Sequence, residues 1–307
     1  MTAATTSRFG VLTGRSLVTG HGTENDFVLV PDPDGTLALT AAEVVAACDR
    51  HTGIGADGLI RVVRSRALPE GQALLADEPA AEWFMDYRNA DGSLAEMCGN
   101  GVRVFVHYLR EAGLVELPDG AGIVVGTRGG ARRVTVAGER YTVEMGTWAM
   151  PGGLPAVEAG YDVVVSVPGL EEPRAGLRVT LPNPHTVVAL PDETTLDAAD
   201  LAHAPTYDPV PPEGTNLELV VPLGEDRLDG ETVGTVRMRV LERGVGETRS
   251  CGTGTCAAAL AVRAWAGAGA PDTWRVLVPG GEVLVRVAGD QVSLTGPAVL
   301  TADVTPR

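Results

Sequence analysis

The chain has 307 residues, is 44% hydrophobic but only 4% aromatic, and carries a formal net charge of −16. Its length predicts about two domains whose cores are filled mainly by aliphatic side chains. Its acidity argues against nucleic acid and against an anionic membrane surface as partners, because both need a basic face.

All 24 basic residues are arginine. The chain therefore cannot form a lysine Schiff base with pyridoxal phosphate, and it has no P-loop lysine. The N-terminus lacks the apolar run of a secretory signal, and no segment has the length and apolarity of a membrane span. Because the four cysteines form no C-x-x-C pair, we expect a protein of the reducing cytoplasm.

In the first half, Thr40 is predicted to cap a helix at Ala41–Cys48, with Glu43 completing a capping box. Residues 65–82, rich in alanine, proline and acids, predict a surface insertion. A second helix is predicted at Val102–Ala112 from its 3.6-residue apolar period, ending at Gly113. Strands are predicted at Asp26–Pro31, 59–64, Trp83–Tyr87, Gly122–Gly126, Arg133–Ala137 and Tyr141–Met145.

Met150–Gly153 is predicted to link two halves. A helix at Thr255–Ala266 is apolar almost all round, which predicts that it is buried. Strands of the second half are predicted at 161–167, 177–181, 185–190, 217–222, 234–241, 274–278, 282–287 and 291–295.

The two halves repeat one pattern, in which β-segments lead to a C-G-x-G turn that opens a helix. The turns are Cys98–Gly101 and Cys251–Gly254. This weak repeat of about 150 residues predicts two similarly folded domains.

A helix start offers unpaired N–H groups and a partial positive charge, and glycines let an anion approach them. A cysteine placed there should have a lowered pKa. Two such turns facing one carboxylate predict inversion of the adjacent carbon: one thiolate removes the α-proton and the other thiol returns a proton to the opposite face.

Other interpretations of the cysteines remain open at this point. A single C-G-x-G turn is commonly a buried cysteine beside turn glycines. Zinc is disfavoured because no paired Cys or His spacing is present. Cys48 and Cys256 lie in apolar helical runs and are predicted to be core residues.

Six segments, taken together and in order, resemble the diaminopimelate epimerases. They are His21–Phe27, Gly53–Gly58, Asn89–Ser93 with Glu96–Gly101, Asn183–His185, Gly214–Asn216, and Glu242–Gly244 with Glu247–Thr248 and Cys251–Gly254. The resemblance implies an α/β (α+β) fold of two pseudo-symmetric domains, each a mostly antiparallel sheet curled around a central helix, with the active site between them. It implies domains at 1–146, to which 297–307 return, and at 147–296.

The resemblance also implies a function, which is cofactor-independent epimerisation of LL-2,6-diaminopimelate to the meso form for lysine and peptidoglycan-precursor synthesis. It implies a small-molecule substrate, a homodimer, and no metal. Cys98 and Cys251 match the acid/base cysteines, and His185 and Glu242 match residues that tune them. Substrate contacts are implied for Asn25, Asn89, Gly99, Asn100, Asn183, Asn216, Glu242, Arg243, Gly252 and Thr253.

These roles suit a diamino diacid, because arginine binds a carboxylate bidentately and asparagine both donates and accepts. Two departures bear on the substrate: Glu24 stands where the family usually has glycine, and Gly58 stands where some members carry an amide. A racemase for another amino acid is therefore an alternative. Proline-racemase-type relatives usually have histidine where Asn100 stands, and non-catalytic relatives lack the cysteine pair.

Overall fold

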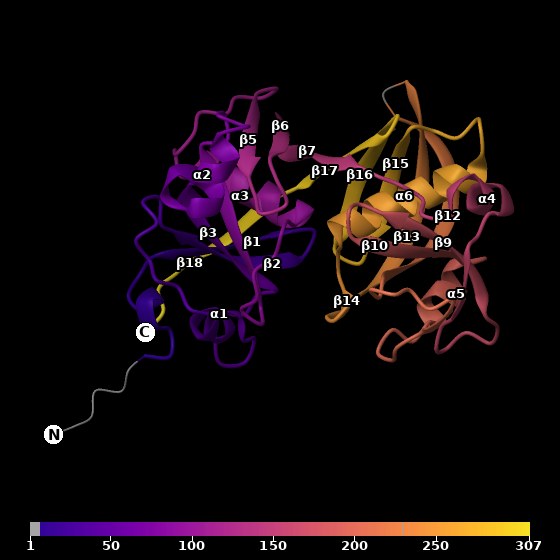
Figure 1. Cartoon of the computed structure of the whole chain (residues 1–307), viewed down its shortest axis with the longest axis horizontal. Coiled ribbons are helices and arrows are strands. Elements are labelled where there is room, and N and C mark those ends of the chain that lie inside the picture. Colours follow the sequence, from indigo (N-terminus) through magenta and orange to yellow (C-terminus); the bar gives the residue numbers. More distant parts are fainter. Residues whose placement is uncertain (1–6, 229) are drawn as a thin grey trace. The chain divides into compact units, whose positions relative to one another are not determined.

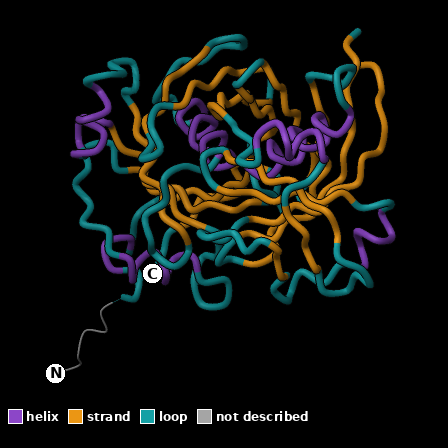
Figure 2. Tube along the Cα trace, turned by 45° about the vertical axis from the view of Figure 1, so that its right-hand side comes forward, coloured by secondary structure: helices purple, strands orange, loops and turns teal. Residues whose placement is uncertain are grey.

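The computed structural model describes residues 7–228 and 230–307, which form two compact units. One unit comprises Met1–Val143 with Pro297–Arg307, and the other comprises Glu144–Gly296. Strands and loops make up most of the trace, with helices set among them (Figure 2). No helix in the described part is long and apolar enough to cross a membrane.

The first unit is built around the helix α3 (Gly99–Glu111), which packs against β1, β2, β3, β4 and β18 (Figure 1). Its strands are β1 (Leu17–Gly22), β2 (Asn25–Pro31), β3 (Gly58–Arg64), β4 (Trp83–Asn89), β5 (Gly122–Gly126), β6 (Arg132–Ala137), the start of β7 (Arg140–Thr147) and β18 (Val299–Val304). Its other helices are α1 (Ala41–Cys48) and α2 (Pro69–Leu75), with 3₁₀ turns at Gly10–Leu12 and Ser65–Ala67.

The second unit is built around α6 (Gly252–Ala266), which packs against β9, β10, β12, β13, β15 and β16. Its strands are β8 (Val163–Ser166), β9 (Arg174–Thr180), β10 (Pro184–Ala189), β11 (Thr206–Asp208), β12 (Asn216–Leu228), β13 (Glu231–Glu242), β14 (Gly246–Thr248), β15 (Thr273–Val278), β16 (Gly281–Ala288) and β17 (Gln291–Pro297). Its other helices are α4 (Gly153–Ala159) and α5 (Glu193–Ala198).

The two units share one topology. From β1 to β7, successive neighbours pair antiparallel, parallel, antiparallel, parallel, antiparallel and antiparallel. The series β9, β10, β12, β13, β15, β16 and β17 repeats that order of pairings. A central helix enters each series at the same place, after β4 and after β13–β14. The predicted fold class, two pseudo-symmetric units of mostly antiparallel sheet around a helix, is confirmed.

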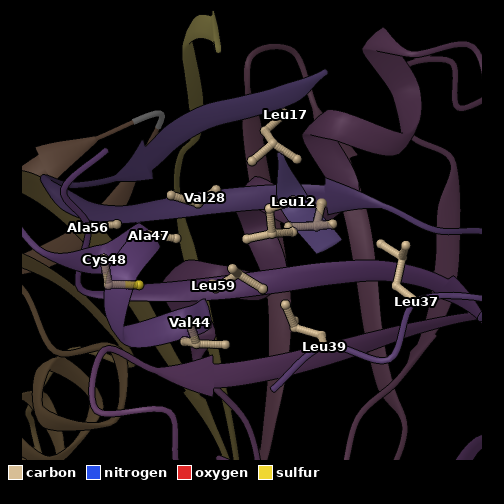
Figure 3. Close-up of a cluster of buried hydrophobic side chains, with 11 residues drawn as sticks. Leu12, Leu17, Val28, Leu37, Leu39, Val44, Ala47, Cys48, Ala56 and Leu59 are labelled. Carbon is tan, nitrogen blue, oxygen red and sulfur yellow. The ribbon is translucent and has the colours of Figure 1, made fainter. Parts of the chain in front are cut away.

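The predicted helix Ala41–Cys48 is confirmed together with its capping box, in which Thr40 Oγ1 accepts from Glu43 N and Glu43 Oε2 accepts from Thr40 N. Cys48 points into an apolar cluster with Leu17, Val28 and Leu59 (Figure 3). Cys256 is fully buried in α6. Both cysteines are core residues, as predicted.

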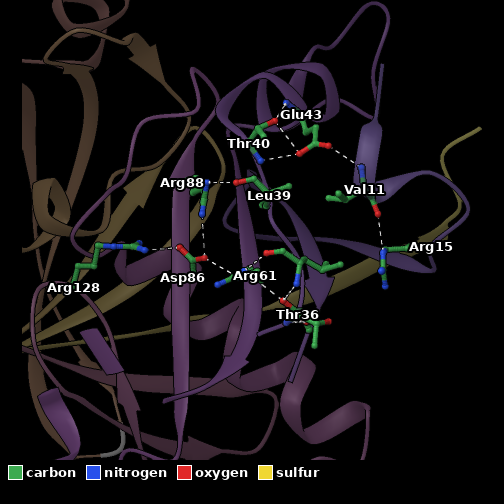
Figure 4. A network of polar contacts seen from close by, with 12 residues as sticks. Val11, Arg15, Thr36, Leu39, Thr40, Glu43, Arg61, Asp86, Arg88 and Arg128 are labelled. Carbon is green, nitrogen blue, oxygen red and sulfur yellow. Dashed lines mark hydrogen bonds and ion pairs between the residues drawn. The ribbon is translucent and has the colours of Figure 1, made fainter. Parts of the chain in front are cut away.

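A buried ionic network joins β3 to β4. Asp86, which is 0% exposed, lies 2.9 Å from Arg61 Nε, 2.7 Å from Arg128 Nη2 and 3.5 Å from Arg88 Nη2 (Figure 4). A carboxylate stays charged in such a place only when cations neutralise it. The network fixes the register in which Arg61 faces Asp86 and Gly58 faces Asn89.

The sequence prediction was incomplete in several places. Residues 65–82, predicted as a surface insertion, contain the helix α2, which was not predicted, and Gly71 packs on Ser65. Met150–Gly152 is a turn that enters α4, which was not predicted. Helix α5 and the strands β1, β11 and β18 were also missed. Both central helices begin three residues earlier than predicted, at Gly99 and Gly252.

Candidate active site

The first half-site consists of Cys98 and the residues that surround it in the first unit. Cys98 is the N-cap of α3, in extended conformation, and its Sγ accepts a hydrogen bond from Gly101 N at 3.4 Å. The following Gly99 and Asn100 are buried in the first helical turn. This turn places the sulfur beside helix N–H groups, which is the local geometry that the C-G-x-G pattern predicts.

Asn25, the first residue of β2, lies between Cys98 and Asp57. Its amide Nδ2 donates to Asp57 Oδ2 at 2.9 Å, which turns its Oδ1 toward Cys98 Sγ at 3.5 Å. Asn100 Nδ2 donates to the same Oδ1 at 3.3 Å. Arg50 holds the other oxygen of Asp57 at 2.7 Å. The contacts of Asp57 determine which end of the Asn25 amide faces the thiol.

Arg103 supports Asn100 from within α3. This arginine is 0% exposed, and its Nη2 donates to Asn100 Oδ1 at 3.0 Å and to Thr23 Oγ1 at 3.2 Å. Its Nε donates to Pro297 O at 3.2 Å. The β1–β2 hairpin, the chain end that returns to this unit and the C-G-N-G turn are therefore joined by one buried cation.

Asn89 ends β4, where its Nδ2 donates to Ser93 Oγ at 3.0 Å and its backbone N donates to Ser93 O at 3.0 Å. These bonds close the loop that leads to Cys98. Gly58 lies opposite Asn89, and a Cβ placed on it would lie 2.6 Å from Tyr87 Cε2. The Tyr87 ring thus fills the space that a side chain at position 58 would need.

The second half-site consists of Cys251 and its surroundings in the second unit. Cys251 is the N-cap of α6, and its Sγ lies 3.5 Å from Thr253 Oγ1. Asn183 Nδ2 donates to that hydroxyl at 3.3 Å, while the Cβ position of Gly254 lies beside the sulfur. This contact is the counterpart of the one between Asn25 and Asn100. Asn25 begins β2 and Asn183 precedes the equivalent strand β10, and each contacts the third residue of its C-G-x-G turn.

Three titratable side chains gather near Cys251. His185 Nδ1 and Glu218 Oε1 are 2.7 Å apart, with both side chains 0% exposed. Glu242, at the end of β13, accepts from Thr248 Oγ1 and contacts Cys251. Burial raises the pKa of Glu242, and its bonds with Thr248 and Cys251 offset part of that rise.

The prediction that a helix start lowers the thiol pKa was wrong for Cys251. Burial raises the pKa of this thiol well above its ordinary value, and the carboxylates of Glu242 and Glu218 raise it further. Bonds with Thr253 and the Gly254 N–H act in the opposite direction but are the smaller effect. Desolvation and like charge therefore outweigh the helix terminus in the isolated half-site.

Asn216 and Arg243 lie together at the start of β12 and the end of β13. Asn216 Oδ1 accepts from Arg243 N at 2.9 Å, and the guanidinium donates to Glu213 O. Arg243 is exposed, whereas Asn216 is 7% exposed. The Asn216 bond therefore fixes the backbone of Arg243, and the exposed guanidinium lies against the Glu213 carbonyl.

The predicted residues thus form two groups, one in each unit. Asn25, Asn89, Gly99 and Asn100 belong with Cys98, whereas Asn183, His185, Asn216, Glu242, Arg243, Gly252 and Thr253 belong with Cys251. Asp57, Arg103 and Glu218 were not predicted as site residues. Within residues 7–228 and 230–307, no cluster of three or more His, Cys, Asp or Glu side chains has the geometry of a metal site.

Comparison with known proteins identifies the family of the chain. The family model described as diaminopimelate epimerase matches residues 17–150 and 178–301. The diaminopimelate epimerases of Streptomyces coelicolor and Thermobifida fusca are each 47% identical to the chain, over 92% of it and over 92% and 95% of their own lengths.

Solved structures show the same fold at low identity. A phenazine biosynthesis protein of the PhzF family from Bacillus anthracis superposes with a TM-score of 0.64 at 16% identity, covering 94% of this chain and 97% of its own. A predicted epimerase from Pseudomonas aeruginosa gives 0.61 at 13%, covering 95% and 98%. These likenesses concern the fold alone.

Proposed function

The chain belongs to the diaminopimelate epimerase family, and on that basis we propose that it interconverts LL-2,6-diaminopimelate and meso-diaminopimelate with two thiols. Cys98 and Cys251 act in this proposal from opposite faces of one α-carbon. The observation that carries it is a repeated arrangement. Each unit caps its central helix with a cysteine, and the two residues that follow, Gly99 and Asn100 or Gly252 and Thr253, lie in the first helical turn.

The reaction needs one thiolate and one thiol at the same time. The thiolate takes the α-proton, and the electron pair moves toward the α-carboxylate. The thiol then donates its proton to the other face, so the two sulfurs exchange states while the carbon is inverted. In this proposal the N–H groups of Gly99, Asn100, Gly252 and Thr253 stabilise the charge that develops on the carboxylate, because donors that are already in place need no reorganisation.

Recognition of the substrate follows from the polar side chains of the two half-sites. Arg243, exposed at the rim, suits the distal carboxylate. Asn25, Asn89, Asn183 and Asn216 offer neutral donors and acceptors for ammonium and carboxylate groups. Glu242 serves as a further contact to an ammonium group. Tyr87, rather than a side chain at position 58, borders the first half-site at the start of β3.

Several wider properties belong to the same proposal. We propose that the two compact units are the two epimerase domains, with the boundary expected near residues 146–147. The enzyme needs no cofactor, since thiols perform the proton transfers and the sequence has no lysine for pyridoxal phosphate. It works in the cytoplasm as a homodimer and supplies the meso isomer for lysine and peptidoglycan-precursor synthesis.

The test is incubation of the protein with LL-diaminopimelate in D₂O. We expect deuterium at the α-carbon together with meso product, and no such change with lysine, proline, histidine or glutamate. Inversion of one of those four but not of diaminopimelate would favour the alternative, a racemase of the same family with another substrate. Absence of exchange with every substrate would contradict the two-thiol reaction.

A further inference from the structure

The two half-sites differ at the point directly behind the cysteine turn. A Cβ placed on Gly101 would lie 3.3 Å from Ile60 Cδ1 and 3.4 Å from Phe27 Cζ, so this point is apolar in the first unit. A Cβ placed on Gly254, the equivalent glycine, would lie 2.7 Å from Glu218 Oε1 and 3.3 Å from Cys251 Sγ. A carboxylate therefore lies behind one catalytic sulfur, and a hydrocarbon wall behind the other.

The strand pairing makes Glu218 the counterpart of Ile60 and His185 the counterpart of Phe27. Asn216 begins β12 as Gly58 begins β3. β12 pairs in parallel with β10, where Asn216 faces His185, and β3 pairs in parallel with β2, where Gly58 faces Phe27. Because side chains two residues apart share a face of a strand, Glu218 lies on the same face as Asn216. The pseudo-symmetry thus replaces two apolar side chains with an acid and an imidazole.

Glu218 is held in place with little freedom. Its side chain is 0% exposed and its Oε1 lies 2.7 Å from His185 Nδ1, a spacing at which the two groups share a hydrogen bond. Burial raises the pKa of Glu218, while the neighbouring His185 favours its charged form. A buried acid needs such a partner, because an unpaired charge in the interior is costly.

Three residues from three strands are the charged or titratable groups near Cys251. The groups facing Cys251 are His185 from β10, Glu218 from β12 and Glu242 from β13. The strands β9, β15 and β16 also carry charged residues, namely Arg174, Arg178, Arg275, Glu282 and Arg286. Of these, Arg178 pairs with Asp162, Arg275 with Glu282, and Arg286 with Glu231.

We propose that Glu218 is a positioning residue that, paired with His185 behind the C-G-T-G turn, keeps Cys251 protonated in the free enzyme and so makes Cys98 the resting thiolate. This inference rests on the proposed two-thiol function. Two thiols in identical surroundings would tend to lose or keep their protons together, and neither state can invert a carbon. A carboxylate behind only one of them favours the singly protonated pair that the reaction needs.

The test is site-resolved alkylation by iodoacetamide, at low extent and over a range of pH, because only the thiolate reacts. Trypsin releases Cys98 in the peptide Asn89–Arg103, and fragmentation separates Cys251 from Cys256 within Ser250–Arg263. In the unmodified protein, the rate at Cys98 should reach half its maximum at a lower pH than the rate at Cys251. An equal or lower midpoint for Cys251 would overturn the proposal.

The variant Glu218→Gln keeps an acceptor for His185 but removes the charge. It should lower the alkylation midpoint of Cys251 by about one pH unit and leave that of Cys98 unchanged. Glu225→Gln, the same change at an exposed position of β12, should move neither midpoint. An unmoved Cys251 midpoint in Glu218→Gln would contradict the proposal.

These measurements use no substrate. A failure of epimerisation in D₂O would therefore count against the proposed function, whereas a failure here would count against Glu218 alone. If Glu218→Gln does not fold, the order of the two midpoints in the unmodified protein still tests whether Cys98 is the resting thiolate, and a lower midpoint at Cys251 would overturn the proposal.

Discussion

The half-sites of Cys98 and Cys251 have the same backbone and different surroundings. Each cysteine caps a central helix, and each has an asparagine contact to the third residue of its turn. Around Cys98 the neighbours are amides, with Asp57 held one contact away. Around Cys251 they include two buried or half-buried carboxylates and an imidazole.

The difference teaches that two properties of the turn have different origins: its N–H donors come from the backbone, whereas the proton affinity of its sulfur depends on neighbouring side chains. The helix start and its glycines supply N–H donors in both units, and this part of the site has stayed symmetric. The proton affinity of the sulfur depends on side chains from neighbouring strands, and this part has diverged. A pair of cysteines with the same sequence pattern need not share one chemical state.

The most severe test of the comparison removes each sulfur in turn. Cys98→Ala and Cys251→Ala should each reduce the rate of inversion by at least about 10³-fold, since one of two obligatory proton-transfer groups is lost. The rate is followed as meso product from LL-diaminopimelate. Cys48→Ala, which changes a core cysteine of the first unit, is the control and should retain the rate per folded molecule. Substantial activity in either catalytic variant would mean that only one sulfur works.

A smaller loss is expected when the first half-site loses its orienting carboxylate. Asp57→Ala frees the Asn25 amide to rotate, and kcat should fall by about 10- to 100-fold, because small misplacements of catalytic groups are costly. Asp57→Asn keeps an oxygen that accepts from Asn25 and should recover part of the rate. An unchanged kcat in Asp57→Ala would mean that catalysis does not depend on a fixed orientation of the Asn25 amide.

The fold around the two half-sites could be predicted from the sequence in part. The two C-G-x-G turns and their helices follow from spacing, since the apolar period of residues 102–112 marks the body of α3. The first turns of the helices were missed because glycine has low helix propensity, and tertiary packing overrides that preference. Strands β1 and β18 were missed because their sequences carry no clear alternation, and their pairing joins residues far apart in the chain.

Glu218 shows why parts of the second half-site could not be predicted from the sequence. In the sequence it is an acid within Leu217–Val220, where alternation suggests a solvated face. Only the parallel pairing of β10 with β12 brings it to His185. The contact of Asp57 with Asn25 likewise joins residues 32 positions apart in the chain. Local sequence patterns do not predict roles that depend on such long-range contacts.

The acids around Cys251 should also give the second half-site a pH-dependent cost. Because burial raises the pKa of Glu242 in the folded state, its contribution to stability is present below the unfolded pKa of about 4.3 and is lost as pH rises through the folded value. Glu242→Gln removes this titration. Urea denaturation should show the variant gaining on the unmodified protein between pH 4.5 and pH 8, as the native Glu242 becomes charged. A difference that is the same at both pH values would place Glu242 in a more solvated site.

The smallest effect is expected in the β1–β2 hairpin, where the first unit carries backbone strain beside Asn25. Thr23 and Glu24 have φ of 51° and 58°, the only positive values at non-glycine positions within the described residues. A two-residue hairpin turn of this type favours glycine at its second position. Glu24→Gly should therefore raise the free energy of unfolding by up to about 1 kcal/mol, as the relieved strain exceeds the added entropy of the unfolded chain. Glu24→Ala removes the same carboxylate but keeps a Cβ, so a gain in both variants would trace to charge instead of backbone conformation.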